Sequence, residues 1–179
     1  MIGQGAFGEV YRAEQPGVGR PVAVKKIRSR FANQPAFIRR FEAEAQLVAR
    51  LEHPHIVPLY DYWRDVHGAY LVMRWLRGGD LHQALQGGPW APQDAARLLD
   101  QLAGALAAAH RQDVVHRDFK PANVLLDGDG NAYLADFGIA ARIMDPTEVA
   151  LLPTSAARYR APEEVAGAPT DRRSDVYSL

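Results

Sequence analysis

Two short polar segments near the middle of the chain contain the side chains best suited to chemistry. The first contains Asp118 and Asn123, and the second contains Asp136. The apolar runs between them flank a Gly- and Asp-rich turn, so a β-hairpin is predicted over residues 124–135. This hairpin would bring the three side chains together at one end. Their carboxylate and amide oxygens suit a hard cation such as Mg²⁺, which commonly shares its ligands with substrate phosphates.

A glycine-rich segment at the N-terminus is a second candidate for contact with phosphates. Glycines recur at Gly3, Gly5 and Gly8, and glycine lets backbone amides approach an anion because no Cβ intervenes. Dinucleotide-binding turns share this spacing, but they open a helix. Here the β-forming residues Val10 and Tyr11 follow instead, which favours a strand. A glycine hairpin that binds no ligand is the alternative interpretation.

Three strands are predicted from β-branched and aromatic residues. The first covers residues 21–27, where alternation puts Lys25 and Lys26 on opposite faces of the sheet. The other two cover residues 59–63 and 69–75, and the polar residues between them would form a short loop. Lys26 is therefore interpreted as a solvated surface lysine, whereas Lys25 remains a candidate for chemistry.

Two helices are predicted from apolar residues at spacings of three and four. The helix over residues 35–52 would bury the stripe Phe37, Phe41, Ala45, Val48 and Leu51. The helix over residues 92–112 would serve as a scaffold, with one face made of Ala96, Leu99, Leu102, Ala103, Leu106 and His110. Asp80 precedes a shorter helical segment and is interpreted as its N-cap.

The composition excludes several classes of partner and site. Lys plus Arg and Asp plus Glu both number 21 in the 179 residues, so nothing favours a nucleic-acid or membrane-surface partner. Without cysteine there is no disulfide, thiolate metal site or cysteine nucleophile, which suits a reducing compartment. No apolar run approaches the roughly 18 residues of a membrane span, and the N-terminus does not resemble a signal peptide.

The ordered motifs resemble the eukaryotic-type (Hanks-type) serine/threonine protein kinases, in a bacterial-like style. The motifs are G-x-G-x-x-G-x-V, V-A-V-K, H-R-D-x-K-P-x-N, D-F-G and A-P-E, which begin at Gly3, Val22, His116, Asp136 and Ala161. The resemblance implies an α+β, bilobal fold, with a small antiparallel sheet and helix αC in the N-lobe. The N-lobe and hinge would cover residues 1–76, without the start of the first strand. A partial, mainly helical C-lobe would cover residues 77–179 and be truncated within helix αF.

The resemblance also implies roles for catalytic residues. Asp118 would orient the substrate hydroxyl and accept its proton, and Lys120 would neutralise charge on the γ-phosphate of ATP. A lysine at this position is typical of the serine/threonine class. Lys25 would contact the α- and β-phosphates and pair with Glu44 of helix αC. Glu42, two residues away and on another face of that helix, is the competing candidate.

The remaining implied site residues bind nucleotide and metal. Asn123 and Asp136 would hold Mg²⁺, with Mn²⁺ as an alternative. Met73 would be the gatekeeper, and backbone groups of residues 74–76 would face the adenine edge. Contact of Asp80 with the ribose is the alternative to its role as an N-cap. The full implied ATP-contacting set is Gly3, Gly5, Gly8, Val10, Ala23, Lys25, Met73, Trp75 and Leu125.

The segment between D-F-G and A-P-E carries the implied regulation. Arg117 would pair with a phosphorylated residue there, the candidates being Thr147, Thr154 and Ser155; control without phosphorylation is the alternative. Ala156 stands where relatives have a threonine that bridges Asp118 and Lys120, so substrate positioning would be impaired.

Two residues near the C-terminus are expected to affect stability. Asp175 would hold the backbone of the catalytic loop. Glu163 would lack its family partner, an arginine beyond residue 179, and would leave a buried carboxylate unpaired. The chain is therefore expected to be poorly stable without further C-terminal residues.

The implied function is ATP-dependent phosphorylation of serine and threonine hydroxyls on protein substrates, in signalling. An ATP-binding or catalytically inert, pseudokinase-like interaction module is the alternative, favoured by Ala156 and by truncation but not by the intact metal-binding set. A small-molecule phosphotransferase is third, because the D-F-G to A-P-E segment suits a peptide platform. The location would be cytoplasmic, in a kinase that is either independent or part of a larger, membrane-anchored protein. Dimerisation is left open.

Overall fold

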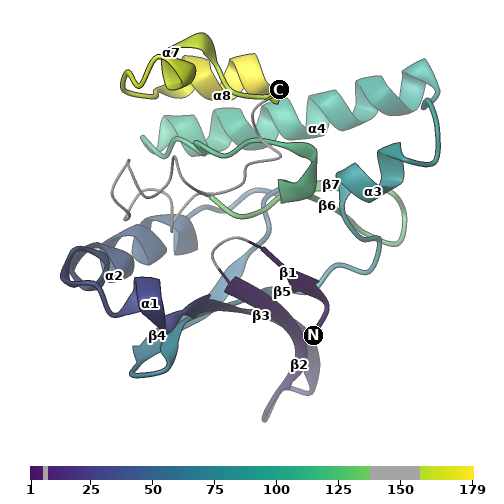
Figure 1. Ribbon diagram of the computed structural model, residues 1–179. Coiled ribbons are helices and arrows are strands. Elements are labelled where there is room, and N and C mark those ends of the chain that lie inside the picture. The colour runs from purple at the N-terminus through teal and green to yellow at the C-terminus, as the bar shows by residue number, and fades with distance from the viewer. Residues whose placement is uncertain (6–7, 138–157) are drawn as a thin grey trace. The chain divides into compact units, whose positions relative to one another are not determined.

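The computed structural model describes residues 1–5, 8–137 and 158–179, and these fall into two compact units (Figure 1). The first unit holds Met1–Arg50 and Pro58–Trp75. The second holds Leu51–Val57 together with residues 76–137 and 158–179. Each unit has its own secondary structure and its own buried residues. The mixture of an antiparallel sheet with helices confirms the predicted α+β class.

An antiparallel five-stranded sheet forms the first unit. In spatial order its strands are β1 (Gly3–Gln4), β2 (Gly8–Gln15), β3 (Arg20–Arg28), β5 (Gly68–Arg74) and β4 (Leu59–Asp65). The predicted strands are present, but the polar loop expected over residues 64–68 is shorter than predicted. Asp65 pairs directly with Gly68, and the Asp65 carboxylate accepts a hydrogen bond from the His67 amide at 2.7 Å. This side-chain contact closes a two-residue turn.

The helix α2 (Pro35–Ala49) packs its predicted apolar stripe into the first unit, after the short helix α1 (Ser29–Ala32). Phe37 and Phe41 are buried and stack at 5.3 Å, and Phe41 meets Tyr62 of β4 edge-on at 6.1 Å. The helix ends three residues earlier than predicted. Arg50 is its C-cap. Leu51 is still buried, as predicted, although it lies beyond the helix end.

Helices and one small hairpin form the second unit. Its helices are α3 (Leu81–Leu85), α4 (Pro92–Arg111), a 3₁₀ turn (Pro121–Asn123), α7 (Pro162–Val165) and α8 (Arg172–Ser178). The predicted hairpin is confirmed as β6 (Val124–Leu126) paired with β7 (Ala132–Leu134). The helix α8 lies against α4 (Figure 1). The Asp80 side chain accepts a hydrogen bond from the Gln83 amide at 2.9 Å, which confirms it as the N-cap of α3.

The predicted apolar face of α4 is partly wrong. Its buried residues are Leu102, Ala105, Leu106, Ala108 and Ala109. Leu102 and Leu106 were predicted, but Ala96 and Ala103 are exposed and Leu99 is 49% exposed. Alanine recurs around most of this helix, so two neighbouring stripes satisfy the same spacing. Packing against β7 and α8 selects the stripe that contains Ala105 and Ala109.

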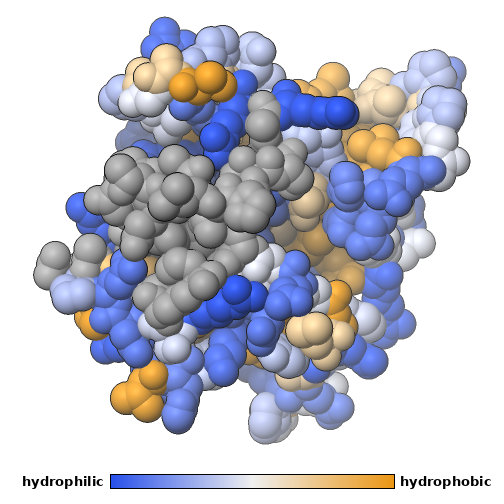
Figure 2. All heavy atoms as spheres, in the orientation of Figure 1, coloured by the Kyte–Doolittle hydropathy of each residue, from blue (hydrophilic) through white to orange (hydrophobic). Residues whose placement is uncertain are grey.

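The surface of the described residues is mixed in polarity. On the face drawn in Figure 2, hydrophobic residues lie in several separate groups among hydrophilic ones. None of the helices in the described part of the chain combines the length and apolar character needed to cross a membrane.

Candidate active site

The second unit brings three predicted site residues together in the loop before β6. The Asp118 carboxylate accepts hydrogen bonds from Lys120 Nζ at 2.7 and 2.8 Å and from Asn123 Nδ2 at 2.9 Å. Asn123 Nδ2 also donates to the Asp118 carbonyl oxygen at 2.7 Å. The 3₁₀ turn that starts at Pro121 makes this possible because it reverses the chain within three residues. The carboxylate is thereby held by two donors from its own loop.

The hairpin brings the backbone just before Asp136 next to the backbone of Asn123. The Ala135 amide donates to the Asn123 carbonyl oxygen at 2.9 Å, which extends the β6–β7 register by one pair. Asp136 follows directly and has a left-handed backbone with φ of 58°. Both residues therefore lie at the same end of the hairpin, as predicted.

The donor atoms at this hairpin end fit a magnesium ion. Asn123 uses its Nδ2 for hydrogen bonds, so its Oδ1 is the side-chain oxygen available to a cation. Asp136 supplies a carboxylate. The described residues contain no cluster of three His, Cys, Asp or Glu side chains that could enclose a metal. Two protein oxygens of this kind match Mg²⁺, which takes its remaining ligands from water and phosphate.

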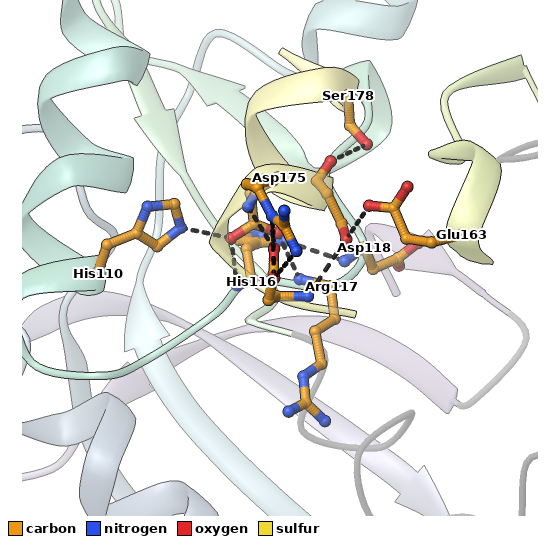
Figure 3. A network of polar contacts seen from close by, with 10 residues as sticks. His110, His116, Arg117, Asp118, Glu163, Asp175 and Ser178 are labelled. Carbon is orange, nitrogen blue, oxygen red and sulfur yellow. Dashed lines mark hydrogen bonds and ion pairs between the residues drawn. The ribbon is translucent and has the colours of Figure 1, made fainter. Parts of the chain in front are cut away.

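The carboxylate of Asp175, on α8, anchors the backbone that leads to Asp118 (Figure 3). Its Oδ2 accepts from the His116 amide and its Oδ1 from the Arg117 amide, both at 2.8 Å. Asp175 is 1% exposed, so these charge-assisted bonds form away from water. The prediction that Asp175 holds the catalytic-loop backbone is confirmed.

His110 is a further member of this network that the sequence analysis interpreted only as part of an apolar face. Its Nε2 donates to Asp175 Oδ2 at 2.7 Å from the last turn of α4 (Figure 3). One signal could have revealed this contact. A histidine on the buried face of a helix needs a polar partner for its ring nitrogen.

His116 is buried and neutral at the centre of the same unit. Its Nδ1 accepts from the Asp118 amide at 3.3 Å, so the proton lies on Nε2, which donates to the Ala135 carbonyl oxygen at 2.9 Å. Its ring lies 4.8 Å from that of Phe137. Complete burial lowers the pKa of His116, although the Ala135 carbonyl and nearby carboxylates oppose this effect. The imidazole therefore links the catalytic loop to the strand before Asp136.

The expectation that Glu163 lacks a partner is wrong. Ser174 Oγ donates to Glu163 Oε1 at 2.6 Å (Figure 3), and Glu163 is partly exposed rather than buried. The hydrogen bond from Ser174 lowers the pKa of Glu163 below its usual value. Ser174 also accepts from the Asp171 amide, within a capping box that begins α8. A local hydroxyl therefore satisfies this carboxylate, which removes the stated reason for low stability.

The first unit aligns the predicted nucleotide-contacting residues through strand register. Val10 pairs with Lys25, and Ala23 pairs with Met73. Residues directly opposite in a sheet share a face, as do alternate residues along a strand. Val10, Ala23, Lys25 and Met73 therefore share one face. Lys26 lies on the other face, as predicted, with its ammonium 6.0 Å from the Tyr70 ring.

The three glycines of the N-terminal motif differ in what their missing side chains permit. A Cβ on Gly8 would lie 1.9 Å from the Lys26 carbonyl oxygen, so the approach of β2 to β3 requires glycine there. Among the described residues, a Cβ on Gly5 would have no neighbour within 4 Å, and one on Gly3 would make ordinary contacts. The described sheet does not need glycine at Gly5. The Gly5 amide donates to the Gly8 carbonyl oxygen at 2.9 Å.

The other predicted residues are found in expected elements. Glu44 lies on α2, half-buried, and Leu125 lies on β6, half-buried between two buried neighbours. The Arg74 amide, one of the backbone groups predicted to face the adenine edge, donates to the Pro58 carbonyl oxygen at 3.1 Å.

Several predictions made from the sequence stay untested. Gly138, Thr147, Thr154, Ser155 and Ala156 lie outside the described residues. Lys25 and Asp136 belong to different units, and their convergence stays a prediction.

Comparison with known proteins gives consistent results. The profile described as "Protein kinase domain" matches residues 1–179. The chain is 40% identical over 182 residues to the serine/threonine-protein kinase PknH of Mycobacterium tuberculosis, with 100% of the chain and 29% of that protein covered. It is 38% identical over 181 residues to the serine/threonine-protein kinase PrkC of Bacillus subtilis, covering 100% and 28%. The corresponding values for PknL of M. tuberculosis are 42% over 183 residues, 99% and 45%.

A solved structure supports the same likeness. The M. tuberculosis PknI kinase domain matches with a TM-score of 0.79 and 34% identity, over 99% of this chain and 66% of that one. This match confirms the predicted kinase-like fold. The chain spans 28% to 45% of the lengths of the three curated relatives described above.

Proposed function

Because the chain belongs to the protein kinase domain family, we propose that it transfers the γ-phosphoryl group of ATP to serine or threonine hydroxyls of protein substrates in signalling. The observation that carries this proposal is the hydrogen-bonded group of Asp118, Lys120 and Asn123. The relatives named serine/threonine-protein kinases support the substrate class. The two compact units would correspond to the N-lobe and C-lobe of a kinase working in the cytoplasm.

The second unit would orient the acceptor and manage its proton. In the reaction the substrate hydroxyl oxygen forms a bond to the γ-phosphorus, and the bond from that phosphorus to the β–γ bridging oxygen breaks. The Asp118 carboxylate would accept the hydroxyl proton late in this step, and ADP would leave. Lys120 already contacts the Asp118 carboxylate, so its ammonium is placed to offset charge on the transferred group. Asn123 and Asp136 would hold Mg²⁺, which neutralises phosphate charge when bound.

The first unit would bind the nucleotide. The backbone at Gly5 would approach the phosphates, and Lys25 would contact the α- and β-phosphates as a compact point charge. Val10, Ala23 and Met73 offer an apolar surface on the same face of the sheet for the adenine. Trp75 would continue this surface beyond the end of β5.

Transfer of labelled phosphate from ATP to a generic basic protein tests the proposal. The variant Asp118→Asn keeps the size of the side chain but cannot accept a proton, so transfer should fall at least about a hundredfold. Asp129→Asn is the matched control, because Asp129 is an exposed acidic residue of the β6–β7 turn. It should transfer as the wild type does. Equal transfer by Asp118→Asn and wild type would overturn the enzyme assignment and favour a nucleotide-binding module.

A further inference from the structure

Arg12 lies on the face of the five-stranded sheet that carries the proposed nucleotide contacts Val10, Ala23, Lys25 and Met73. It belongs to none of the sequence motifs. In the sheet register Arg12 pairs with Ala23, which in turn pairs with Met73. Paired residues share a face, so Arg12 lies in one row with two proposed adenine contacts. The neighbouring row contains Val10 and Lys25. Arg12 is therefore part of the same surface and not of the opposite one.

The guanidinium of Arg12 covers the indole of Trp75. Its Cζ lies 4.4 Å from the centroid of the Trp75 ring, which is within the range of a cation–π contact. Arg12 is exposed and Trp75 is half-buried. The contact joins the middle of β2 to the segment that follows β5, two parts of the first unit that the sheet register alone does not connect.

The direction of β2 decides which part of a nucleotide this pair would meet. The strand starts at Gly8, at the glycine turn, and Arg12 lies two residues farther from that turn than Val10. Two residues of strand span about 6.6 Å. The proposed phosphate groups belong near the glycines and Lys25, so Arg12 and Trp75 lie toward the base end.

We infer that Arg12 and Trp75 form a stacked platform for the purine base and that Arg12 raises the affinity for the nucleotide. This inference rests on the proposed function. Arg12 holds the indole in a fixed orientation, and the planar guanidinium extends the flat surface. Because the base is uncharged, the platform serves adenosine and ATP alike. Arg12 would consequently affect binding and KM without affecting phosphoryl transfer.

The test measures nucleotide binding directly by the fluorescence of Trp75. The chain has three tryptophans, so a Trp63→Phe, Trp90→Phe background leaves Trp75 as the only reporter. In this background Arg12→Met keeps an unbranched stem but removes the cation and its plane. The Kd of ATP and the Kd of adenosine should both rise about threefold to tenfold. The Trp75 emission should shift to longer wavelength, and kcat in the wild-type background should stay within twofold.

A second arginine–aromatic pair in the same unit supplies the control. Arg20 lies 3.6 Å from the ring centroid of Tyr60, and its Nε donates to Gln15 at 2.6 Å. Arg20→Met therefore removes a similar stack at the far end of β2 and β3, and should leave both Kd values unchanged. Arg12→Lys, which keeps charge but loses the plane, should recover less than half of the lost affinity.

Three outcomes would overturn the inference. They are unchanged Kd values in Arg12→Met, a loss restricted to ATP with adenosine unaffected, and an equal loss in Arg20→Met. A different result reports failure of the proposed function itself: absence of any fluorescence response to ATP and adenosine in the background chain, together with absence of phosphate transfer by the wild type.

Discussion

The two units of this kinase domain are built around different kinds of core. Among the described residues, the four buried polar or charged ones are His116, Asn123, Ser174 and Asp175, and all belong to the second unit. The buried residues described in the first unit are apolar, including Val22, Ile27, Phe37, Phe41 and Leu71. The stability of the first unit therefore depends on how apolar side chains fill its core. The stability of the second unit depends in addition on hydrogen bonds to buried polar groups.

This difference teaches how each unit holds its functional groups. Strand register aligns Val10 and Lys25 in the first unit, and a sheet tolerates exchange of one apolar residue for another of similar size. In the second unit, the backbone before Asp118 is held by a single buried carboxylate. A buried group left without its partner costs far more than a small change in volume. Substitutions of the residues that hold the catalytic loop should therefore destabilise the protein more than substitutions of apolar residues in the first unit.

Removal of the Asp175 carboxylate should have the largest effect on stability. Asp175→Ala leaves the His116 amide, the Arg117 amide and the His110 ring without an acceptor. Removing one partner of a buried, hydrogen-bonded charged group typically costs about 3–5 kcal/mol, so the free energy of unfolding, measured by urea denaturation, should fall by about that amount. The apolar counterpart in the first unit, Ile27→Val, should cost only about 0.5–1.5 kcal/mol.

The milder variant Asp175→Asn keeps one side-chain oxygen and should fall between these values, so the comparison survives if the alanine variant does not fold. Asp100→Ala, on the exposed side of α4, is the control for loss of an acidic residue. A cost for Asp175→Ala no larger than that of Ile27→Val would contradict the comparison.

The next largest effect on stability is expected from the buried face of α4, which differs from the face predicted from the sequence. Leu102 is 1% exposed and Leu99 is 49% exposed, although both leucines fit the predicted stripe. Leu102→Ala should destabilise by about 2–5 kcal/mol because it leaves a cavity, whereas Leu99→Ala should change stability by less than about 1 kcal/mol. Thermal unfolding of the two variants compares them directly. Similar losses would mean that the apolar stripe originally predicted is buried after all.

The glycine motif gives an intermediate effect that separates structure from ligand binding. Gly8→Ala would push a Cβ against the Lys26 carbonyl oxygen, and forced overpacking typically costs about 1–3 kcal/mol. Gly5→Ala meets no neighbour in the described part of the chain, so stability should change by less than about 1 kcal/mol while KM for ATP rises. Unfolding curves and steady-state kinetics on both variants measure the two effects. An unchanged KM in Gly5→Ala would assign that glycine to no ligand.

The sequence predicted some of these features better than others, for physical reasons. Phe37, Phe41 and Ala45 were predicted as core because they recur at spacings of three and four along one stripe of α2. The buried stripe of α4 was not, because alanine gives that helix two equivalent stripes. The Asp175 contact came from family resemblance and spans 58 and 59 residues of sequence, so no local pattern could give it. The Ser174–Glu163 bond depends in the same way on where two short helices meet.

The smallest predicted effect is a pH dependence that belongs to the second unit. Burial lowers the pKa of His116 below its ordinary value of 6.5, so the unfolded chain takes up a proton at a higher pH than the folded chain does. The stability contributed by the neutral imidazole is complete above pH 6.5 and is lost as the pH falls below it. The Tm should therefore decrease between pH 7.5 and pH 5.5.

The variant His116→Phe replaces the titrating imidazole with a ring that binds no proton. His116→Phe should have a lower Tm at pH 7.5, because the Asp118 amide and the Ala135 carbonyl lose a partner, but a flatter dependence on pH. Some dependence should remain, since burial also lowers the pKa of His53. His67→Gln, at the exposed turn of the first unit, should keep the wild-type slope. A slope that disappears in His67→Gln and persists in His116→Phe would place the pH sensitivity in the apolar unit, against the contrast between the two cores.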